Sequence, residues 1–195
     1  MSDRNATITR KTRETEIRVV VDLDGTGKAA VDTGLGFLDH MLDSLARHAR
    51  LDLELSCTGD LHIDDHHSVE DCAITLGRAL LEALGEKRGV RRFGHAYAPL
   101  DESLARAVID LSGRPWPQVE LGLRRESIGG VACENLEHFF RSLAIELRAS
   151  LHVDVLRGEN DHHRVEAAFK SLALALRDAI AVEDDQVRST KGVLE

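Results

Sequence analysis

The sequence contains little of what several classes of protein require. Aromatic residues make up 4% of its 195 residues, and the net charge of −9 leaves no basic excess. Because stacking on bases and binding to phosphate backbones would both be weak, we expect no nucleic-acid partner. The three cysteines, Cys57, Cys72 and Cys133, are scattered. They predict neither a disulfide framework nor a Cys-x-x-Cys site, and a reducing cytoplasm is the expected location.

Long apolar runs are also missing. No stretch approaches the roughly 20 apolar residues of a membrane-spanning helix, and residues 1–10 are polar and lack the apolar core of a signal peptide. With 43% hydrophobic and 30% charged residues, the chain is predicted to be a soluble globular protein without a membrane partner. Its length allows one substantial core or two small fused ones.

The chain repeats itself. The similar pairs of segments are residues 15–25 and 103–113, 36–46 and 134–144, 49–55 and 149–155, and 66–70 and 162–166. The pairs come in the same order in both halves, at an offset of about one hundred residues. One match can arise by chance, but an ordered series indicates an internal duplication. We therefore predict a single domain over 1–195, built of two repeats at about 7–90 and 91–185.

Each repeat mixes strands and helices. Alternating apolar residues predict the strands, and apolar residues three or four positions apart predict the helices. The predicted elements of the first half are a strand over 17–23, a helix over 37–45, a strand over 51–55 and a helix over about 68–84, whose counterpart in the second half spans 165–182. Since regular strand–helix alternation is missing, we predict an α+β fold with gathered helices covered by sheets. The polar tail, 183–195, is expected to be a mobile arm.

The motif His-His-x-x-Glu occurs twice among the ten histidines. Residues at i and i+4 share a helix face, whereas residue i+1 points about 100° away. His66 and Glu70 can therefore bind one metal ion while His67 points elsewhere, and the same geometry applies to residues 162–166. One motif thus offers two ligands to one ion and one ligand to another.

The two motifs together can hold two ions symmetrically. The repeat aligns two lone histidines, His40 and His138, so each ion can take three histidines and one glutamate. Imidazole and carboxylate ligands with open positions suit Mn²⁺ or Fe²⁺, whereas structural zinc prefers a closed tetrahedral site. Histidine pairs at two solvated helix starts would explain one motif, but not two copies with matched lone histidines. The histidines expected to have no metal role are His48, His62, His95 and His152.

Two alternatives remain beside a metal enzyme. Residues 19–26, VVVDLDGT, resemble the motif of haloacid-dehalogenase phosphatases, with Asp22 as the nucleophile. Against this, the aligned segment of the second half, residues 110–113, lacks the second aspartate, and the strand–helix alternation of that fold is missing. Asp-Gly after an alternating strand is an ordinary tight turn. The other alternative is a non-catalytic protein that assembles around metal ions.

The motifs resemble those of the imidazoleglycerol-phosphate dehydratase family over nearly the whole chain. The matching stretches are GFLDHML, DDHHSVED, RRFG, PLDESL, DLSGRP, NLEHFF, NDHHRVEAAFK and STKGVL. The resemblance implies an internally duplicated α+β fold, ribosomal protein S5 domain 2-like, with four helices packed between two four-stranded mixed β-sheets. It also implies a monofunctional hydro-lyase of histidine biosynthesis, which dehydrates D-erythro-imidazole-glycerol phosphate to imidazole-acetol phosphate.

The resemblance further implies two Mn²⁺ ions per active site, or Fe²⁺ or another divalent ion, which stabilise an imidazolate. One ion would be held by His40, His67, His162 and Glu166, and the other by His66, Glu70, His138 and His163. The implied catalytic residues are Glu14, which acts as acid/base, Glu70 and Glu166. The implied substrate-binding residues are Glu14, His40, His48, Arg92, Arg114, Lys170, Ser189 and Lys191. Residues 186–195 would close on the substrate, and a contact by Ser44 is left open.

Members of this family are expected to assemble as homo-oligomers of twenty-four subunits built from trimers, with metal sites at subunit contacts. The repeat offers a physical reason for such an arrangement. Each ion takes ligands from both halves, and nothing requires both halves to belong to one chain.

Overall fold

The computed structural model describes residues 4–192 and residue 194. Within these residues the chain forms four helices, two four-stranded sheets and one two-stranded sheet. The helices are α1 (Gly36–Ala49), α2 (His66–Leu84), α3 (Cys133–Glu146) and α4 (Asp161–Ile180). The strands are β1 (Asn5–Lys11), β2 (Thr15–Asp22), β3 (Ala29–Asp32), β4 (Asp52–Gly59), β5 (Phe93–Leu100), β6 (Ser103–Asp110), β7 (Trp116–Glu120), β8 (Ser127–Ile128), β9 (Val131–Ala132) and β10 (Ser150–Arg157). The predicted α+β class is confirmed.

The first sheet has the strand order β1-β2-β4-β3, in which β3 runs parallel to β4 and the other neighbours are antiparallel. The alternating side chains of Ile17, Val19 and Val21 on β2 are completely buried, as expected for a strand with one face on the core. Because β2 is antiparallel to both neighbours, the segment that follows it does not lie in the parallel sheet of a doubly wound phosphatase. The backbone N–H of Gly25 instead closes a tight turn onto the carbonyl of Asp22, so the phosphatase alternative is not favoured.

The second sheet has the corresponding order β5-β6-β10-β7, and here β7 is the parallel strand. Each half thus contains a hairpin, a third strand, a helix, a fourth strand beside the hairpin, and a closing helix. The boundaries of the two repeats remain predictions. The second half also contains the pair β8 and β9, which was not predicted because strands of two residues show no periodicity. Its turn, Gly129-Gly130, has positive φ at both residues, as glycine allows.

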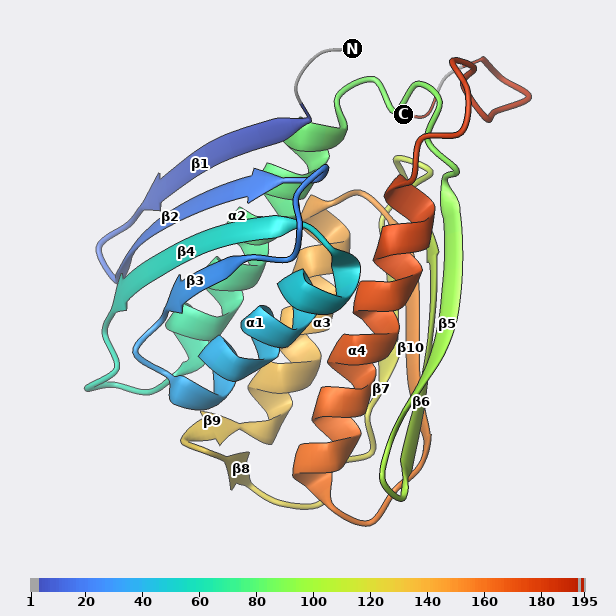
Figure 1. The fold of residues 1–195 in the computed structure, drawn as a ribbon. Coiled ribbons are helices and arrows are strands. Elements are labelled where there is room, and N and C mark those ends of the chain that lie inside the picture. The colour runs from blue at the N-terminus through green and yellow to red at the C-terminus, as the bar shows by residue number, and fades with distance from the viewer. Residues whose placement is uncertain (1–3, 193, 195) are drawn as a thin grey trace.

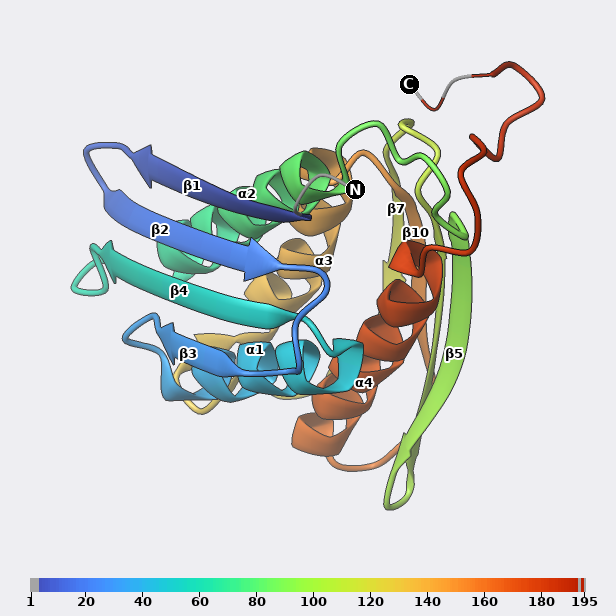
Figure 2. The same ribbon diagram turned by 45° about the horizontal axis from the view of Figure 1, so that its top comes forward.

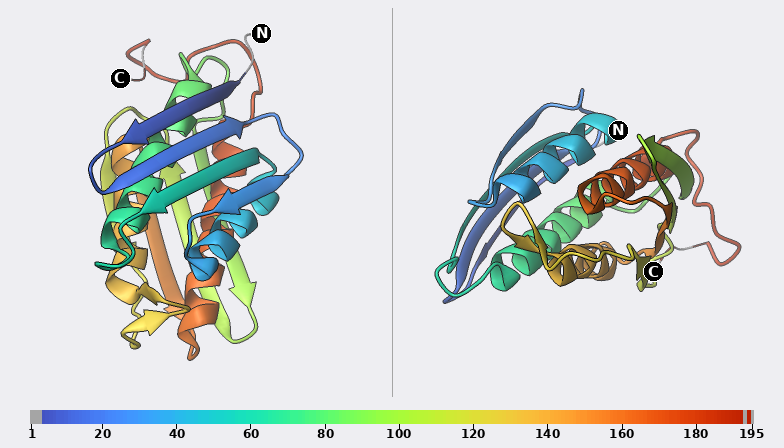
Figure 3. Two further views of the ribbon diagram at one scale, coloured as in Figure 1. Left: turned by 90° about the vertical axis from the view of Figure 1, so that its left-hand side faces the viewer. Right: turned by 90° about the horizontal axis from the view of Figure 1, so that it is seen from below.

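The helices form a layer between the two four-stranded sheets (Figure 1). α1 and α2 pack on the first sheet, and α3 and α4 pack on the second. The tilted view in Figure 2 and the view from below in Figure 3 show the sheets on opposite sides of this layer. Within the layer, α1 lies against α4 and α2 lies against α3. Each of these pairs joins one helix from each half of the chain.

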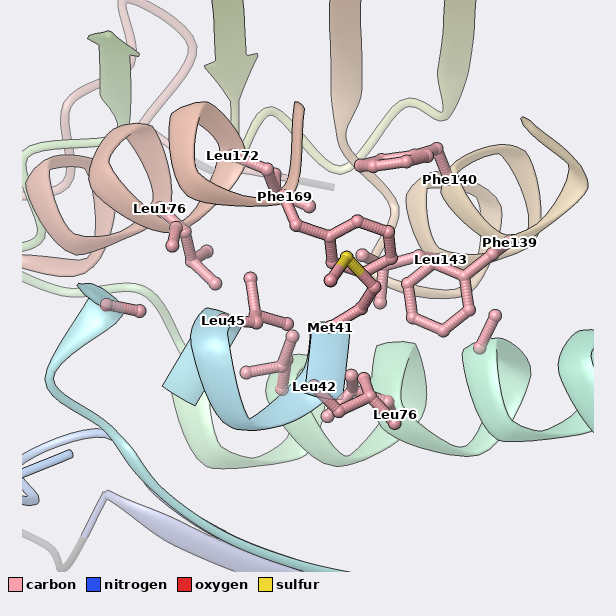
Figure 4. Packing of buried hydrophobic residues seen from close by; sticks show 14 of the residues in the cluster. Met41, Leu42, Leu45, Leu76, Phe139, Phe140, Leu143, Phe169, Leu172 and Leu176 are labelled. Atoms are coloured by element: carbon pink, nitrogen blue, oxygen red, sulfur yellow. The ribbon is translucent and has the colours of Figure 1, made fainter. Parts of the chain in front are cut away.

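Large apolar side chains from these helices meet in one core (Figure 4). Phe139 and Phe140 of α3 and Phe169 of α4 are fully buried, and the ring centroids of Phe140 and Phe169 are 4.7 Å apart. Gly77 allows α2 and α3 to approach closely, because a Cβ at this position would lie 2.9 Å from the carbonyl oxygen of Leu143. The core therefore sets the spacing of the helices whose ends carry the histidine motifs.

Two predictions near the C-terminus are wrong. The last helix was predicted to reach residue 182 but ends at Ile180, because Val182 forms a β-bridge with Val90. The backbone of residues 183–186 then hydrogen-bonds to Gly89 at 2.9 and 2.8 Å. This part of the tail is anchored and is not the mobile arm that its polarity indicated.

Among the described residues, no helix combines the length and the hydropathy of a membrane span. Cys57, Cys72 and Cys133 are buried free thiols. The cytoplasmic location expected from the cysteines remains a prediction.

We expect Phe169→Ala to lower the free energy of unfolding by about 3–5 kcal/mol, the usual cost of truncating a buried phenylalanine. Phe169 contacts both Phe139 and Phe140, so its loss leaves a cavity between α3 and α4. Denaturant titration measures the change. Ile63→Ala is the control, because Ile63 is 64% exposed and its truncation should cost less than about 0.5 kcal/mol. Equal costs for the two variants would show that the phenylalanine cluster does not stabilise the fold.

Candidate functional site

Both histidine motifs lie in the first turn of a helix. α2 begins at His66, two residues before the predicted start, and α4 begins one residue before His162. The side chain of Asn160 caps α4 by accepting the backbone N–H of His162 at 3.0 Å. Asp64 accepts the backbone N–H of His66 at 2.9 Å. These hydrogen bonds hold the first turns and so decide where the motif side chains leave each helix.

The first group, the α2–α3 cluster, consists of His66, Glu70 and His138. Nε2 of His138 lies 2.9 Å from Oε1 of Glu70, and the rings of His66 and His138 stack with centroids 5.2 Å apart. Nδ1 of His66 lies 2.9 Å from Oδ1 of the buried Asn135 on α3. One donor atom from each member lies within 4.8 Å of the others. The i and i+4 residues of the motif thus share a face, and the lone histidine comes from the other half.

The second group, the α1–α4 cluster, consists of His40, His162 and Glu166. Oε2 of Glu166 lies 3.3 Å from Nε2 of His40 and 3.2 Å from Nε2 of His162. Donor atoms of the three residues again lie within 4.8 Å of one another. The ring of Phe37 packs edge-on against His162, with centroids 5.1 Å apart. This cluster repeats the composition of the first with the roles of the two halves exchanged.

A lysine neutralises the α1–α4 cluster. Nζ of Lys170 lies 2.8 Å from Oε1 of Glu166, one helical turn earlier. Burial alone would raise the pKa of Glu166, but the hydrogen bond and charge of Lys170, with the hydrogen bond from His40, lower it overall. Burial, with the charges of Lys170 and Arg47, lowers the pKa of His48. Glu166 is therefore held as a carboxylate, the form that binds cations, and His48 as a neutral imidazole.

The second histidine of each motif lies outside both clusters. Nδ1 of His67 is 3.0 Å from Oδ2 of Asp60, and Nδ1 of His163 is 2.8 Å from Oε2 of Glu102. The hydrogen bonds to these carboxylates raise the pKa of both imidazoles. The hydrogen bond from His163, with two backbone N–H groups, lowers the pKa of Glu102. Within the described part of one chain, the structure therefore assembles three of the four ligands predicted for each ion.

Four of the predicted substrate-binding residues line one cavity of about 530 Å³. The lining residues are Arg92, Arg114, Arg188, Ser189, Thr190, Lys191 and Leu194. Arg92 is bidentate to Asp110 at 2.7 and 3.0 Å, and also donates to the carbonyl oxygen of Arg188 at 2.7 Å. The surplus of arginine and lysine makes this cavity suitable for an anion such as a phosphate group. Lys170 does not line it, since Lys170 lies in contact with Glu166 instead.

The predicted acid/base lies beside one of the candidate ligands. Glu14 is exposed in the loop between β1 and β2, and its Oε1 is 3.9 Å from Nε2 of His67. Ser44, by contrast, is buried, and its hydroxyl oxygen has no hydrogen-bond partner among the described residues. Its burial argues against a direct contact with substrate. Exposed histidines outside both clusters are His62, His95 and His152.

Several residues that hold the site together belong to no motif that was predicted to bind a ligand. Glu102 directly precedes the repeated segment 103–113, as Glu14 precedes its counterpart, so the repeat carried a signal for it. Asn135 precedes His138 by three positions, which makes them helical neighbours. The contacts of Asp60 and Arg188 could not be predicted, because they depend on where a loop and the tail lie.

The donor sets of the two clusters fit divalent cations. Each cluster offers two imidazole nitrogens and one carboxylate, and neither includes a thiolate. Ions such as Mn²⁺ and Fe²⁺ accept this mixture and keep positions open for further ligands. The arrangement can thus hold two cations and, at the arginine-lined cavity, one anionic group.

Known proteins share both the sequence and the fold of this chain. The family model of imidazoleglycerol-phosphate dehydratase matches residues 33–176. The chain is 54% identical over 191 residues to the imidazoleglycerol-phosphate dehydratase of Chlorobium luteolum, covering 98% of this chain and 96% of that protein. It is 55% identical over 186 residues to that of Methanothermobacter thermautotrophicus, covering 95% of both.

Two solved structures of imidazoleglycerol-phosphate dehydratases have the same architecture. The Staphylococcus aureus protein aligns with a TM-score of 0.83 at 36% identity, covering 92% of this chain and 99% of the other. The Pyrococcus furiosus protein, solved in complex with (S)-C348, aligns with a TM-score of 0.83 at 42% identity, covering 96% and 100%. The similarity extends over nearly the full length in sequence and in fold, so the chain belongs to the imidazoleglycerol-phosphate dehydratase family, the hydro-lyases that act in histidine biosynthesis.

Proposed function

We propose that this chain dehydrates D-erythro-imidazole-glycerol phosphate to imidazole-acetol phosphate at a site that holds two divalent cations. The observation that carries the proposal is the pair of matched clusters, each with two histidines and one glutamate drawn from opposite halves. The cavity lined by Arg114 and Lys191 supports it, because phosphate groups are bound by charge-assisted hydrogen bonds from such side chains.

Mn²⁺ is the proposed ion, with Fe²⁺ or another divalent cation as the alternative. The α1–α4 cluster, completed by His67, would hold one ion, and the α2–α3 cluster, completed by His163, would hold the other. When bound, such ions supply Lewis-acid stabilisation for negative charge that develops on the imidazole ring. That charge arises because the proton leaves a carbon with no adjacent carbonyl, so the ring must accept the electrons.

Glu14 is the proposed acid/base. Its side chain is 53% exposed and 3.9 Å from the ring of His67. It can therefore accept the proton from the second carbon of the glycerol chain, while the hydroxyl on the carbon beside the ring leaves as water, and return a proton to the carbon beside the ring as the enol becomes the ketone. Glu70 and Glu166 would take part in catalysis as ligands. We further propose that His40, His48 and Lys170 contact the substrate at the α1–α4 cluster.

The phosphate of the substrate would bind in the cavity described above. The side chains assigned to it are Arg92, Arg114, Ser189 and Lys191. The backbone N–H of Arg92 bonds to Ala179, about 20 Å along α4 from Glu166, so the cavity and the clusters that bind one substrate molecule would belong to different subunits. Residues 186–195 would close over the phosphate. This role explains why a polar tail is held against the body of the protein.

The fourth ligand of each ion would come from a neighbouring subunit. In one chain, His67 and His163 lie outside the clusters that they would complete. We therefore propose a homo-oligomer of twenty-four subunits built from trimers, with the metal sites at subunit contacts. The free energy of metal binding is then also free energy of assembly.

We expect Glu14→Gln to reduce kcat for imidazole-glycerol phosphate by about 10² or more, because the amide cannot accept the proton. Metal content and KM should stay near those of the wild type. Glu16→Gln is the matched control, since Glu16 lies in the adjacent strand, is 57% exposed and pairs with Lys11. Near-normal turnover by Glu14→Gln would exclude Glu14 as the acid/base. If the Mn²⁺-loaded wild type shows no turnover, the non-catalytic alternative is preferred.

We expect Lys191→Ala to weaken binding of a phosphorylated substrate analogue by about 1.5–3 kcal/mol, the value of a charge-assisted hydrogen bond. Binding of plain triazole at the metals should change little, and titration calorimetry compares the two ligands. Lys191 is a cleaner choice than Arg92, whose removal would leave Asp110 without its partner. Arg188→Ala is the control, because Arg188 lines the cavity but pairs with Glu183 at 2.7 Å. Equal losses for both ligands would contradict a phosphate role.

A chelator at neutral pH should convert the assembled particle into smaller species and abolish activity. Added Mn²⁺ should restore size and activity in parallel, because the ions would link subunits. Sedimentation velocity measures the size, and chelator already saturated with Mn²⁺ is the control. A metal-free protein that keeps its full size would exclude the ions from the subunit contacts.

A further inference from the structure

His67 and His163 are each held by a carboxylate that no motif includes. Asp60 contacts Nδ1 of His67 at 3.0 Å, and Glu102 contacts Nδ1 of His163 at 2.8 Å. An ionised carboxylate can only accept, so the imidazole must donate from Nδ1. The neutral ring then carries its free lone pair on Nε2, the nitrogen that faces away from the carboxylate.

We propose that Asp60 and Glu102 are positioning residues, which fix the tautomer and ring orientation of His67 and His163 so that Nε2 can bind an ion. The inference rests on the proposed function, in which these histidines complete the two metal sites. Ligating histidines in metal proteins usually donate their second N–H to a carboxylate or carbonyl, and this contact contributes to metal affinity. Here the carboxylates are in place on the chain itself.

Both carboxylate oxygens of Glu102 accept hydrogen bonds. Its Oε1 accepts the backbone N–H groups of Glu159 and Asn160 at 3.0 and 2.9 Å, and the hydroxyl of Ser103 at 3.1 Å. Its Oε2 is left for His163. The three donors at Oε1 all require an acceptor oxygen there. In a glutamine at position 102 the amide oxygen would therefore occupy the Oε1 position, and the amide N–H₂ would point toward His163.

In the first half, a different residue accepts the hydrogen bond from the histidine. Glu14 and Glu102 occupy equivalent positions, each directly before the second strand of its half. In the first half the carboxylate of Asp60, the first residue after β4, accepts the hydrogen bond from Nδ1 of His67. The side chain of Glu14 remains 53% exposed. The same hairpin position therefore carries an exposed carboxylate near Nε2 of the histidine in one half, and a carboxylate hydrogen-bonded to Nδ1 of the histidine in the other.

The residue after the fourth strand differs between the halves. Gly59 and Gly158 correspond, because a Cβ at Gly59 would collide with Oγ of Ser68 and a Cβ at Gly158 with Oγ of Ser103. The next residue is Asp60 in the first half and Glu159 in the second. Glu159 offers its backbone N–H to Glu102, so the hairpin glutamate of the second half is the carboxylate that holds the histidine.

The test compares Mn²⁺ binding by metal-depleted wild type and Glu102→Gln, with free Mn²⁺ followed by electron paramagnetic resonance. The glutamine amide should keep the backbone contacts but donate to Nδ1 of His163, which moves the ring proton to Nε2 and blocks ligation. We expect one of the two ions per chain to bind about 10–100-fold more weakly, with thermal unfolding of the metal-free protein unchanged. Glu54→Gln is the matched control, because it makes the same exchange at a glutamate on β4 that is 68% exposed and pairs with Arg18.

Unchanged Mn²⁺ affinity in a folded Glu102→Gln variant would overturn the proposal while leaving the proposed function intact. A wild type that binds no Mn²⁺ would instead overturn the metal part of the proposed function. If Glu102→Gln does not fold, Asp60→Ala decides. It should weaken the other ion by a similar factor, and normal affinity for both ions in that variant would overturn the proposal.

Discussion

The site depends on one packing constraint, the crossing of the two halves within the helical layer. α1 lies against α4 and α2 against α3, so the first turn of each motif helix meets a lone histidine from the other half. Neither half could form a complete cluster with its own histidines in this arrangement. Buried phenylalanines pack α3 against α4. Gly77 lets α2 and α3 approach closely, because it has no side chain between them. Packing of apolar side chains, rather than any interaction among the polar ones, brings the donor atoms within reach of one another.

Duplication produced two similar units that the surrounding contacts have made different. Both hairpins end in a glutamate before the second strand, but Glu14 is exposed whereas Glu102 accepts four hydrogen bonds. The difference follows from the residue that comes after the glycine of the fourth strand. Asp60 accepts the hydrogen bond from the histidine in the first half, whereas the backbone N–H groups of Glu159 and Asn160 fix Glu102 beside His163 in the second. Local contacts thus separate an exposed carboxylate from one that holds a ring in place.

The tail shows how backbone contacts can override composition. Its polar sequence resembles that of a mobile arm, yet hydrogen bonds to Gly89 and the bridge between Val90 and Val182 anchor its first part. Because of this anchor, residues 188–191 reach the cavity that also contains Arg92 and Arg114. Arg92 links the two segments, since it bonds both to Asp110 and to the carbonyl of Arg188.

The sequence by itself determined the fold class, the duplication and the histidine and glutamate composition of the two clusters. Alternating and helical apolar patterns report local burial, and i, i+4 spacing decides which residues share a face. The family resemblance also paired each lone histidine with the motif that it joins. Only the tertiary structure decided that His67 and His163 turn away from both clusters, and that Asp60 and Glu102 hold them. It also decided the length of the last helix and the course of the tail. These features depend on contacts between residues far apart in the chain, and neither periodicity nor propensity encodes such contacts, because both report only the neighbours along the sequence.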